Sequence, residues 1–108
     1  MGWECLEAPE AFTGLSMAET HQPSLIILDL MMPLMDGFEF LVEASQRHTL
    51  RDIPVVILTA KELTESDRKR LVWPQVREVL RKGLCSKEEI LRRVRQYART
   101  HVLRTDGN

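Results

Sequence analysis

The stretch that decides the fold is Leu25-Ile26-Ile27-Leu28-Asp29-Leu30-Met31-Met32-Pro33, in which a run of branched apolar residues ends at an acid. A run this short, without alternation, is typical of a parallel strand buried on both faces. A second run, Pro54-Val55-Val56-Ile57-Leu58, has the same character and ends at Thr59. A buried helix gives similar runs, but both are too short for one and a proline closely precedes each. The two runs therefore predict two buried parallel strands.

In the segments around these strands, apolar residues recur at the spacing of one face of a helix. We expect helices from Glu10 to about His21, from Gly37 to about Gln46, from an N-cap at Thr64 to Leu71, and after an N-cap at Ser86. Weaker strands are expected at Trp3 to Ala8 and at Glu78 to Arg81. This alternation of strand and helix predicts an α/β fold, a three-layer sandwich whose parallel sheet is joined by right-handed crossovers.

Length and charge bound the possible functions. The chain has 108 residues, enough for one domain, and its net charge of -1 excludes the global positive charge of a nucleic-acid coat or a membrane-surface binder. Its apolar runs fall short of the roughly 18 residues that cross a bilayer. With no export signal at the start, Cys5 and Cys85 are expected to be free thiols in a reducing cytoplasm. We therefore predict a cytoplasmic protein that binds neither nucleic acid nor membrane.

Three polar residues follow three of the expected strands. They are Asp29, Thr59 and Lys82, a carboxylate, a hydroxyl and an ammonium. Because the carboxyl ends of parallel strands meet at one edge of the sheet, these side chains are expected to lie together. A carboxylate can act as a nucleophile, while a hydroxyl and an ammonium can bind the oxygens of a phosphoryl group. The pattern indicates phosphoryl chemistry at Asp29, with loop capping as the simpler alternative.

The segments around these residues resemble one family. The stretch from Leu25 to Gly37 is similar to the phosphoacceptor strand and loop of the receiver domains of two-component response regulators. Val55 to Lys61 resembles their switch strand, and Val79-Leu80-Arg81-Lys82-Gly83 resembles the segment with their lysine. The resemblance implies a flavodoxin-like receiver fold, with residues 1–103 as a receiver-like domain. Because the last residues of a chain are often poorly ordered, we expect residues 104–108 to form a disordered tail.

The resemblance also implies a role for each residue. Asp29 looks like the phosphorylated aspartate, Thr59 like the switch hydroxyl and Lys82 like the lysine that pairs with phosphate, while Asp29 and the Met31 carbonyl would hold Mg²⁺. The implied partner is a histidine kinase or a histidine phosphotransfer domain. Such a chain is a signalling phosphoacceptor and not an enzyme beyond transferring phosphate to itself. The segment from Lys82 to Glu89 most resembles receivers at the C-terminus of hybrid sensor kinases.

The chain departs from the family at its beginning. Residues 2–8 already match the family's second strand, so the receiver is N-terminally truncated and lacks the first strand, the first helix and the acidic pair that follows that strand. Mg²⁺ prefers several oxygen ligands, so Asp29 with one carbonyl makes a poor site. Glu7 or Glu10 is a candidate replacement acid. Without a replacement, a pseudo-receiver or fragment that binds protein partners without being phosphorylated is the alternative function.

The missing strand is central in the family's sheet order, 2-1-3-4-5. Its absence predicts open edges inside the sheet, unless the flanking strands close up, another chain fills the gap or the early strand is loose. We therefore expect a homo-oligomer that covers the open edges, or a rearranged sheet in which Trp3 to Ala8 no longer occupies the family's place. Two smaller departures are Gly83, where the family usually has proline, and Val79, where many receivers carry an aromatic switch residue. A third function, an aspartate-nucleophile phosphatase of the haloacid-dehalogenase type, would need a second Asp where Met31 stands.

Overall fold

Five parallel strands and the helices between them make up the computed structural model, which describes residues 4–8, 11–30, 35–59, 63–98 and 101–106. The elements are β1 (Glu4–Ala8), α1 (Ala11–His21), β2 (Leu25–Leu30), α2 (Met35–Gln46), β3 (Val55–Thr59), α3 (Glu65–Arg70), β4 (Val76–Arg81), α4 (Lys87–Arg95) and β5 (His101–Asp106). The strands lie in the order β1-β5-β2-β3-β4. The predicted α/β sandwich with a parallel sheet is confirmed, and the predicted elements up to α4 are found within a few residues of their expected bounds.

The C-terminal strand β5 is the element that the sequence analysis did not predict. It lies between β1 and β2, where Leu103 is the register partner of both Leu6 and Ile26. Val102, Leu103 and Thr105 have no exposed surface. The expected disordered tail of residues 104–108 is therefore wrong for residues 104–106, which end β5, while residues 107–108 lie outside the described part of the chain.

This placement fills the gap that the sequence predicts in the sheet. In the flavodoxin-like order 2-1-3-4-5 the second place in the sheet belongs to the family's first strand, and in this chain β5 occupies that place. Unpaired backbone groups at an internal edge are costly, and β5 supplies partners to β1 on one side and β2 on the other. The open edges that led us to expect a homo-oligomer are thus absent from the described sheet, and none of the three ways of closing the gap that we considered is the one observed.

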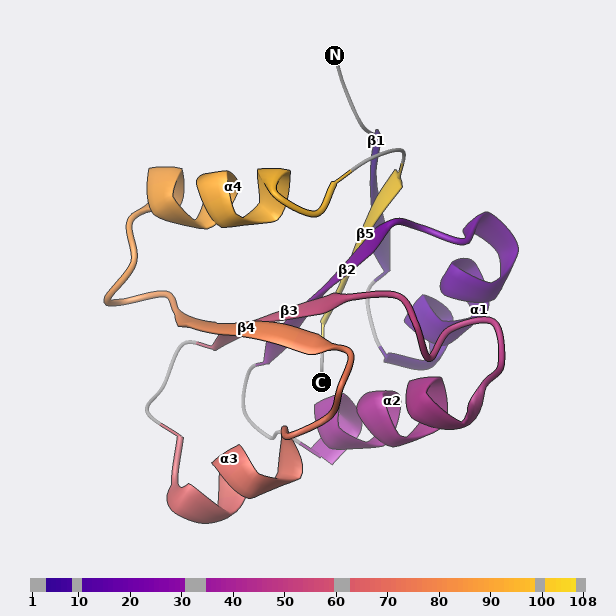
Figure 1. Ribbon diagram of the computed structural model, residues 1–108, viewed down its shortest axis with the longest axis horizontal. Helices are drawn as coiled ribbons and strands as arrows, with labels where there is room; N and C mark the ends of the chain where they lie inside the picture. Colours follow the sequence, from indigo (N-terminus) through magenta and orange to yellow (C-terminus); the bar gives the residue numbers. More distant parts are fainter. Residues whose placement is uncertain (1–3, 9–10, 31–34, 60–62, 99–100, 107–108) are drawn as a thin grey trace.

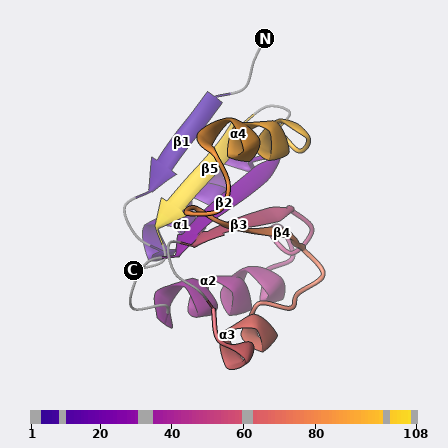
Figure 2. The ribbon, with the colours of Figure 1, turned by 90° about the vertical axis from the view of Figure 1, so that its left-hand side faces the viewer.

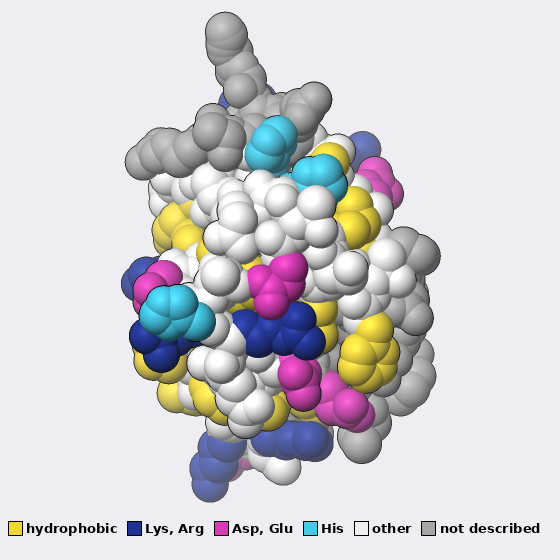
Figure 3. Space-filling model, turned by 90° about the vertical axis from the view of Figure 1, so that its right-hand side faces the viewer, with side chains coloured by type: hydrophobic (Ala, Val, Ile, Leu, Met, Phe, Trp, Pro, Cys, Tyr) yellow, Lys and Arg dark blue, Asp and Glu magenta, His cyan; other side chains and the backbone are white. Residues whose placement is uncertain are grey.

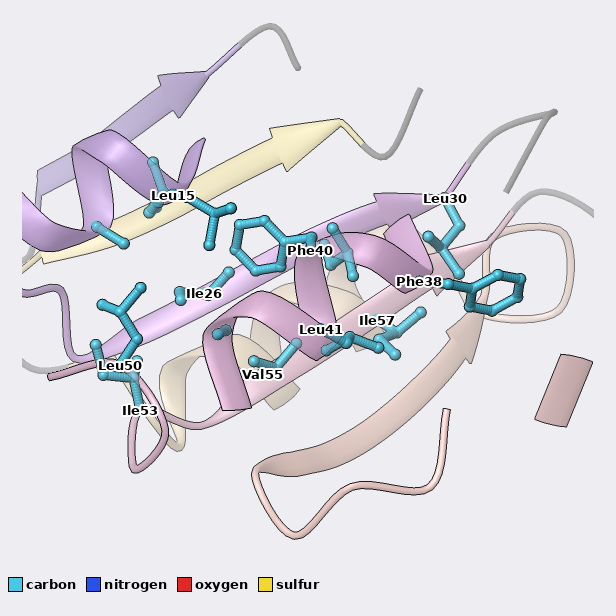
Figure 4. Close-up of a cluster of buried hydrophobic side chains, with 14 of the residues drawn as sticks. Leu15, Ile26, Leu30, Phe38, Phe40, Leu41, Leu50, Ile53, Val55 and Ile57 are labelled. Carbon is cyan, nitrogen blue, oxygen red and sulfur yellow. The ribbon is translucent and has the colours of Figure 1, made fainter. Parts of the chain in front are cut away.

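The sheet separates two hydrophobic layers, and Figures 1 and 2 show that helices cover both of its faces. One face carries α1, α2 and α3, and Figure 4 shows Phe40 and Leu41 of α2 among side chains of β2 and β3, including Ile26 and Ile57. The other face carries α4, where Val94 packs with Ile27 and Val102. Because side chains alternate along a strand, β2 contributes to both layers, and all its residues are buried.

The two predicted N-caps, Thr64 and Ser86, are confirmed. The Thr64 hydroxyl accepts a hydrogen bond from the Asp67 backbone N–H, and the Asp67 carboxylate accepts one from the Thr64 N–H, which makes a capping box. The Ser86 hydroxyl accepts from the Glu89 N–H at the start of α4. These caps mark the residues at which α3 and α4 begin.

The surface mixes charges of both signs. Figure 3, which views the molecule from the side of α1 and α2, shows acidic and basic side chains next to one another rather than one large patch. On this side Arg47 forms ion pairs with Glu19 and Glu43. Among the described residues no helix combines the length and apolar character needed to span a membrane.

Candidate functional site

The carboxyl ends of β2, β3 and β4 meet at one edge of the sheet and bring two of the predicted site residues into contact. Asp29 is the penultimate residue of β2, and Lys82 follows the last residue of β4. The Lys82 Nζ donates to Asp29 Oδ2 over 2.9 Å. Although β3 separates the two strands, the long lysine side chain spans this distance. The prediction that Asp29 and Lys82 lie together is confirmed by the geometry.

Thr59 joins this edge as the last residue of β3. It is the register partner of Leu30, one residue beyond Asp29, and is 2% exposed. Its carbonyl accepts a hydrogen bond of 2.8 Å from the Lys82 backbone N–H, which ties the two predicted site residues together through the main chain. The end of β3 and the segment that carries Lys82 are therefore joined by a direct backbone hydrogen bond.

Arg104 of β5 is a site residue that the sequence analysis missed. Its Nη2 lies 2.5 Å from Asp29 Oδ2, so the same carboxylate oxygen accepts from an arginine and a lysine. We missed it because residues 104–108 were assigned to a tail. The signal was present in His101-Val102-Leu103-Arg104-Thr105, where adjacent apolar residues and a β-branched threonine fit a strand that ends in polar residues.

The Asp29 carboxylate is 1% exposed, so its negative charge needs partners inside the protein. A buried charge is tolerated when it is paired and hydrogen-bonded, and Lys82 and Arg104 meet this need at Oδ2. Both cations remain partly accessible, with side-chain exposures of 35% and 43%. The other oxygen, Oδ1, is buried and has no hydrogen-bond partner among the described residues. Asp29 therefore has one oxygen held by cations and one whose lone pairs remain available.

The side chains that the structure describes around Asp29 do not by themselves make a Mg²⁺ site. The described residues include no group of three or more acidic, histidine or cysteine side chains that could hold a metal ion, and at Asp29 the contacting groups are cations. Glu7 of β1 pairs in register with Arg104 of β5, which in turn pairs with Ile27 of β2. Glu7 is therefore two strands from Asp29, and its register position lies two residues before it. The register partner of Asp29 across β5 is Asp106. Met31 and Glu10, the other expected ligands, lie outside the described residues.

A groove opens next to Thr59 and is bordered by the end of β3, by β4 and by α3. It has a volume of about 420 Å³ and is lined by Thr59, Leu63, Arg68, Val79, Leu80, Arg81, Leu84 and Cys85. Val79, which stands where many receivers carry an aromatic switch residue, is 40% exposed. A Cβ atom on Gly83 would meet nothing within 4 Å, so the turn after Lys82 is open to solvent. The groove links the buried Thr59 with the accessible face of α3 and β4.

Comparisons with known proteins agree on one similarity. The family model for the response regulator receiver domain matches residues 1–95. The phosphate regulon transcriptional regulatory protein PhoB of Escherichia coli is 30% identical over 112 residues, which is 98% of this chain and 48% of that protein. The response regulator PleD of Caulobacter vibrioides is 43% identical over 58 residues, or 54% of this chain and 13% of that protein.

A solved structure is similar in fold as well as in sequence. The N-terminal domain of a response regulator receiver protein from Methanoculleus marisnigri superposes with a TM-score of 0.57 and 29% identity, covering 81% of this chain and 68% of that one. This chain spans about half the length of PhoB and less of PleD. What these similarities support is therefore the domain, and not the further segments of the longer relatives.

Proposed function

Because the chain belongs to the response regulator receiver family, we propose that it is the phosphoacceptor module of a two-component phosphorelay, with Asp29 as the acceptor. The observation that carries this proposal is the contact between the buried Asp29 carboxylate and Lys82 at 2.9 Å, at the carboxyl edge of a parallel sheet. The module is a signalling protein whose chemistry is limited to receiving, and by hydrolysis losing, one phosphoryl group.

The chemistry follows from the two oxygens of Asp29. Oδ2 is held by cations, and Oδ1, which has no hydrogen-bond partner among the described residues, is the oxygen that attacks phosphorus. As its bond to phosphorus forms, the bond from phosphorus to the donor's imidazole nitrogen breaks, and the electron pair leaves with the imidazole. Lys82 stabilises the phosphoryl oxygens as they acquire charge. The donor is a histidine kinase or a histidine phosphotransfer domain, and we place the reaction in the cytoplasm.

The readout is a change at the groove lined by Thr59. A hydroxyl at the end of β3 can turn toward a phosphoryl oxygen on Asp29, and the hydrogen bond from Lys82 N–H to Thr59 carries the shift into the turn after β4. The side chain of Val79 lacks the polar tip and rotameric reach of an aromatic switch. We therefore propose that partner binding responds to the groove formed by α3, β4 and the following turn, through Thr59 and not through residue 79.

Incubation with acetyl phosphate, followed by intact mass spectrometry, tests this function. We expect one added phosphoryl group on the wild-type chain and none on Asp29→Asn. Asp52→Asn is the matched control, because Asp52 is exposed in the turn after α2 and should not alter labelling. A Thr59→Ala chain should still be labelled while losing the shifts that labelling produces in the amide NMR signals around the groove. Equal labelling of wild type and Asp29→Asn would rule out Asp29.

A pseudo-receiver is the second candidate, and the two cations on Asp29 Oδ2 favour it. An arginine and a lysine that both hold the carboxylate could keep it from reacting, while the fold and the groove still bind a protein partner. This candidate predicts a folded chain that acetyl phosphate and phosphohistidine donors both fail to label. Labelling at Asp29 would exclude it.

A further inference from the structure

Arg104 reaches Asp29 from the strand that fills the place of the family's first strand. In a parallel pair the register sets Arg104 beside Ile27, two residues before Asp29, and the side chain extends toward the carboxyl edge to place Nη2 at 2.5 Å from Oδ2. In the family this strand ends in acids that hold Mg²⁺. Here β5 also ends at an acid, Asp106, the register partner of Asp29, but the β5 side chain that the structure describes on the acceptor carboxylate is the cation Arg104.

The charge balance at this site favours a phosphoryl group over a divalent metal. Among the side chains that the structure describes at Asp29, the two cations Lys82 and Arg104 exceed the single carboxylate by one positive charge, which disfavours Mg²⁺ there. A phosphoryl group carries a charge of about −1.5 to −2 near neutral pH. Once Asp29 is phosphorylated, the two cations therefore come close to balancing it without a metal. A planar guanidinium also matches the spacing of two phosphoryl oxygens, which an ammonium does not.

We propose that Arg104 supplies the positive charge that other receivers take from Mg²⁺, so that phosphorylation of Asp29 proceeds without a divalent metal. This inference rests on the proposed function. With acetyl phosphate as donor, the bond from Asp29 Oδ1 to phosphorus forms while the bond from phosphorus to the acetate oxygen breaks, and acetate leaves with the electron pair. Arg104, 43% exposed, is accessible to the incoming group and stabilises its oxygens together with Lys82.

The first test compares labelling of Asp29 by acetyl phosphate in excess EDTA and in millimolar Mg²⁺. We expect the wild-type rates in the two conditions to agree within about threefold. Arg104→Gln should lose at least tenfold in EDTA, and Arg104→Lys should retain part of the rate. Arg95→Gln, on an exposed position of α4, is the matched control and should label like wild type. Circular dichroism melts establish that each variant is folded.

The second test measures the metal directly and needs only the wild-type chain. Titration with Mn²⁺, a paramagnetic substitute for Mg²⁺, should leave the amide signals of Leu28 and Leu30 unbroadened at concentrations that saturate an ordinary receiver. Broadening that disappears in Asp106→Asn would show that Asp106, the register partner of Asp29, has replaced the missing acids, and would overturn the role of Arg104.

The outcomes separate this inference from the function it rests on. Labelling of Asp29 that falls more than tenfold in EDTA, or Arg104→Gln that labels like wild type in EDTA, overturns the role of Arg104 and leaves the phosphoacceptor function intact. No label at Asp29 in either condition overturns the phosphoacceptor function, and the inference with it.

Discussion

Thr105 of β5 lies directly against Gly14 of α1. A Cβ atom added to Gly14 would stand 2.5 Å from Thr105 Oγ1 and 2.8 Å from Thr105 Cβ, closer than real Cβ contacts allow. The helix therefore packs on the strand with no space for a side chain at this position. Glycine is unfavourable inside a helix on propensity alone, and the close approach of β5 explains why this position has one.

This contact predicts that Gly14→Ala destabilises the protein. In an exposed helix the change would stabilise by up to about 1 kcal/mol, because alanine is the better helix former. Here the new methyl group meets the Cβ of a buried strand residue, and overpacking of this kind costs about 1–3 kcal/mol. Urea unfolding measures the difference, and Ser16→Ala, exposed on the same helix, is the control with an expected change within about 0.5 kcal/mol.

A second substitution makes this test specific to β5. Thr105→Gly removes the atoms that a methyl group on Gly14 would meet, so the double variant should lose less stability than the two single changes add up to. Additive losses, or a Gly14→Ala chain as stable as wild type, would mean that β5 does not lie beneath α1.

A large-to-small substitution at Leu103 tests separately how much β5 contributes to stability. It has no exposed surface and belongs to the same hydrophobic layer as Ile26 and Leu15. Leu103→Ala should therefore cost about 2–5 kcal/mol of unfolding free energy, as large-to-small changes in cores do. Leu84→Ala, at a leucine that is 77% exposed, is the matched control. Losses of similar size at the two positions would contradict a central β5.

Much of this fold could be predicted from the sequence because its signals are local. The apolar runs of β2 and β3 are unambiguous, and the capping residues Thr64 and Ser86 mark where α3 and α4 begin. The site residues Asp29, Thr59 and Lys82 followed from the rule that parallel strands end at one edge. Local pattern and topology agreed at these positions, so the prediction needed no long-range information.

The part that was missed depends on contacts between the ends of the chain. His101–Asp106 has only a short apolar core, and it becomes a strand because β1 and β2 leave a slot with unpaired backbone groups on both sides. Comparison with the family also misled us, since the family fills this slot with a strand from the beginning of its chain. Arg104 went unnoticed for the same reason.

The thiol of Cys5 reports on Arg104 from the neighbouring strand. Burial raises the pKa of Cys5 and the negative charge of Glu7 raises it further, whereas Arg104 lowers it. Because the thiolate is the reactive form, Cys5 in a Cys85→Ser chain should react with iodoacetamide more slowly at pH 8 than a small free thiol does. Glu7→Gln should speed the reaction and Arg104→Gln should slow it. A faster reaction in Arg104→Gln would contradict the position of that cation.

Glu89 gives α4 a dependence on acid pH. Hydrogen bonds from Arg93 and then Arg92 lower the pKa of this partly exposed carboxyl below its ordinary value. Its stabilising effect is therefore present above the unfolded-state pKa and is lost as the pH falls through the lower pKa of the folded chain. Carboxyl NMR titration should show the pKa of Glu89 rising in Arg93→Gln and unchanged in Arg95→Gln. An unchanged pKa in Arg93→Gln would mean that the ion pair does not persist in solution.

The identity of the phosphorylated residue is the most direct test of the claim that Asp29 is the acceptor. The chain is incubated with a phosphorylated histidine phosphotransfer domain and reduced with borohydride, which converts an aspartyl phosphate to homoserine, and its peptides are then sequenced by mass spectrometry. We expect homoserine at position 29 and at no other aspartate. Homoserine at another position, or unchanged Asp29 after the donor has transferred its phosphate to the chain, would contradict the claim.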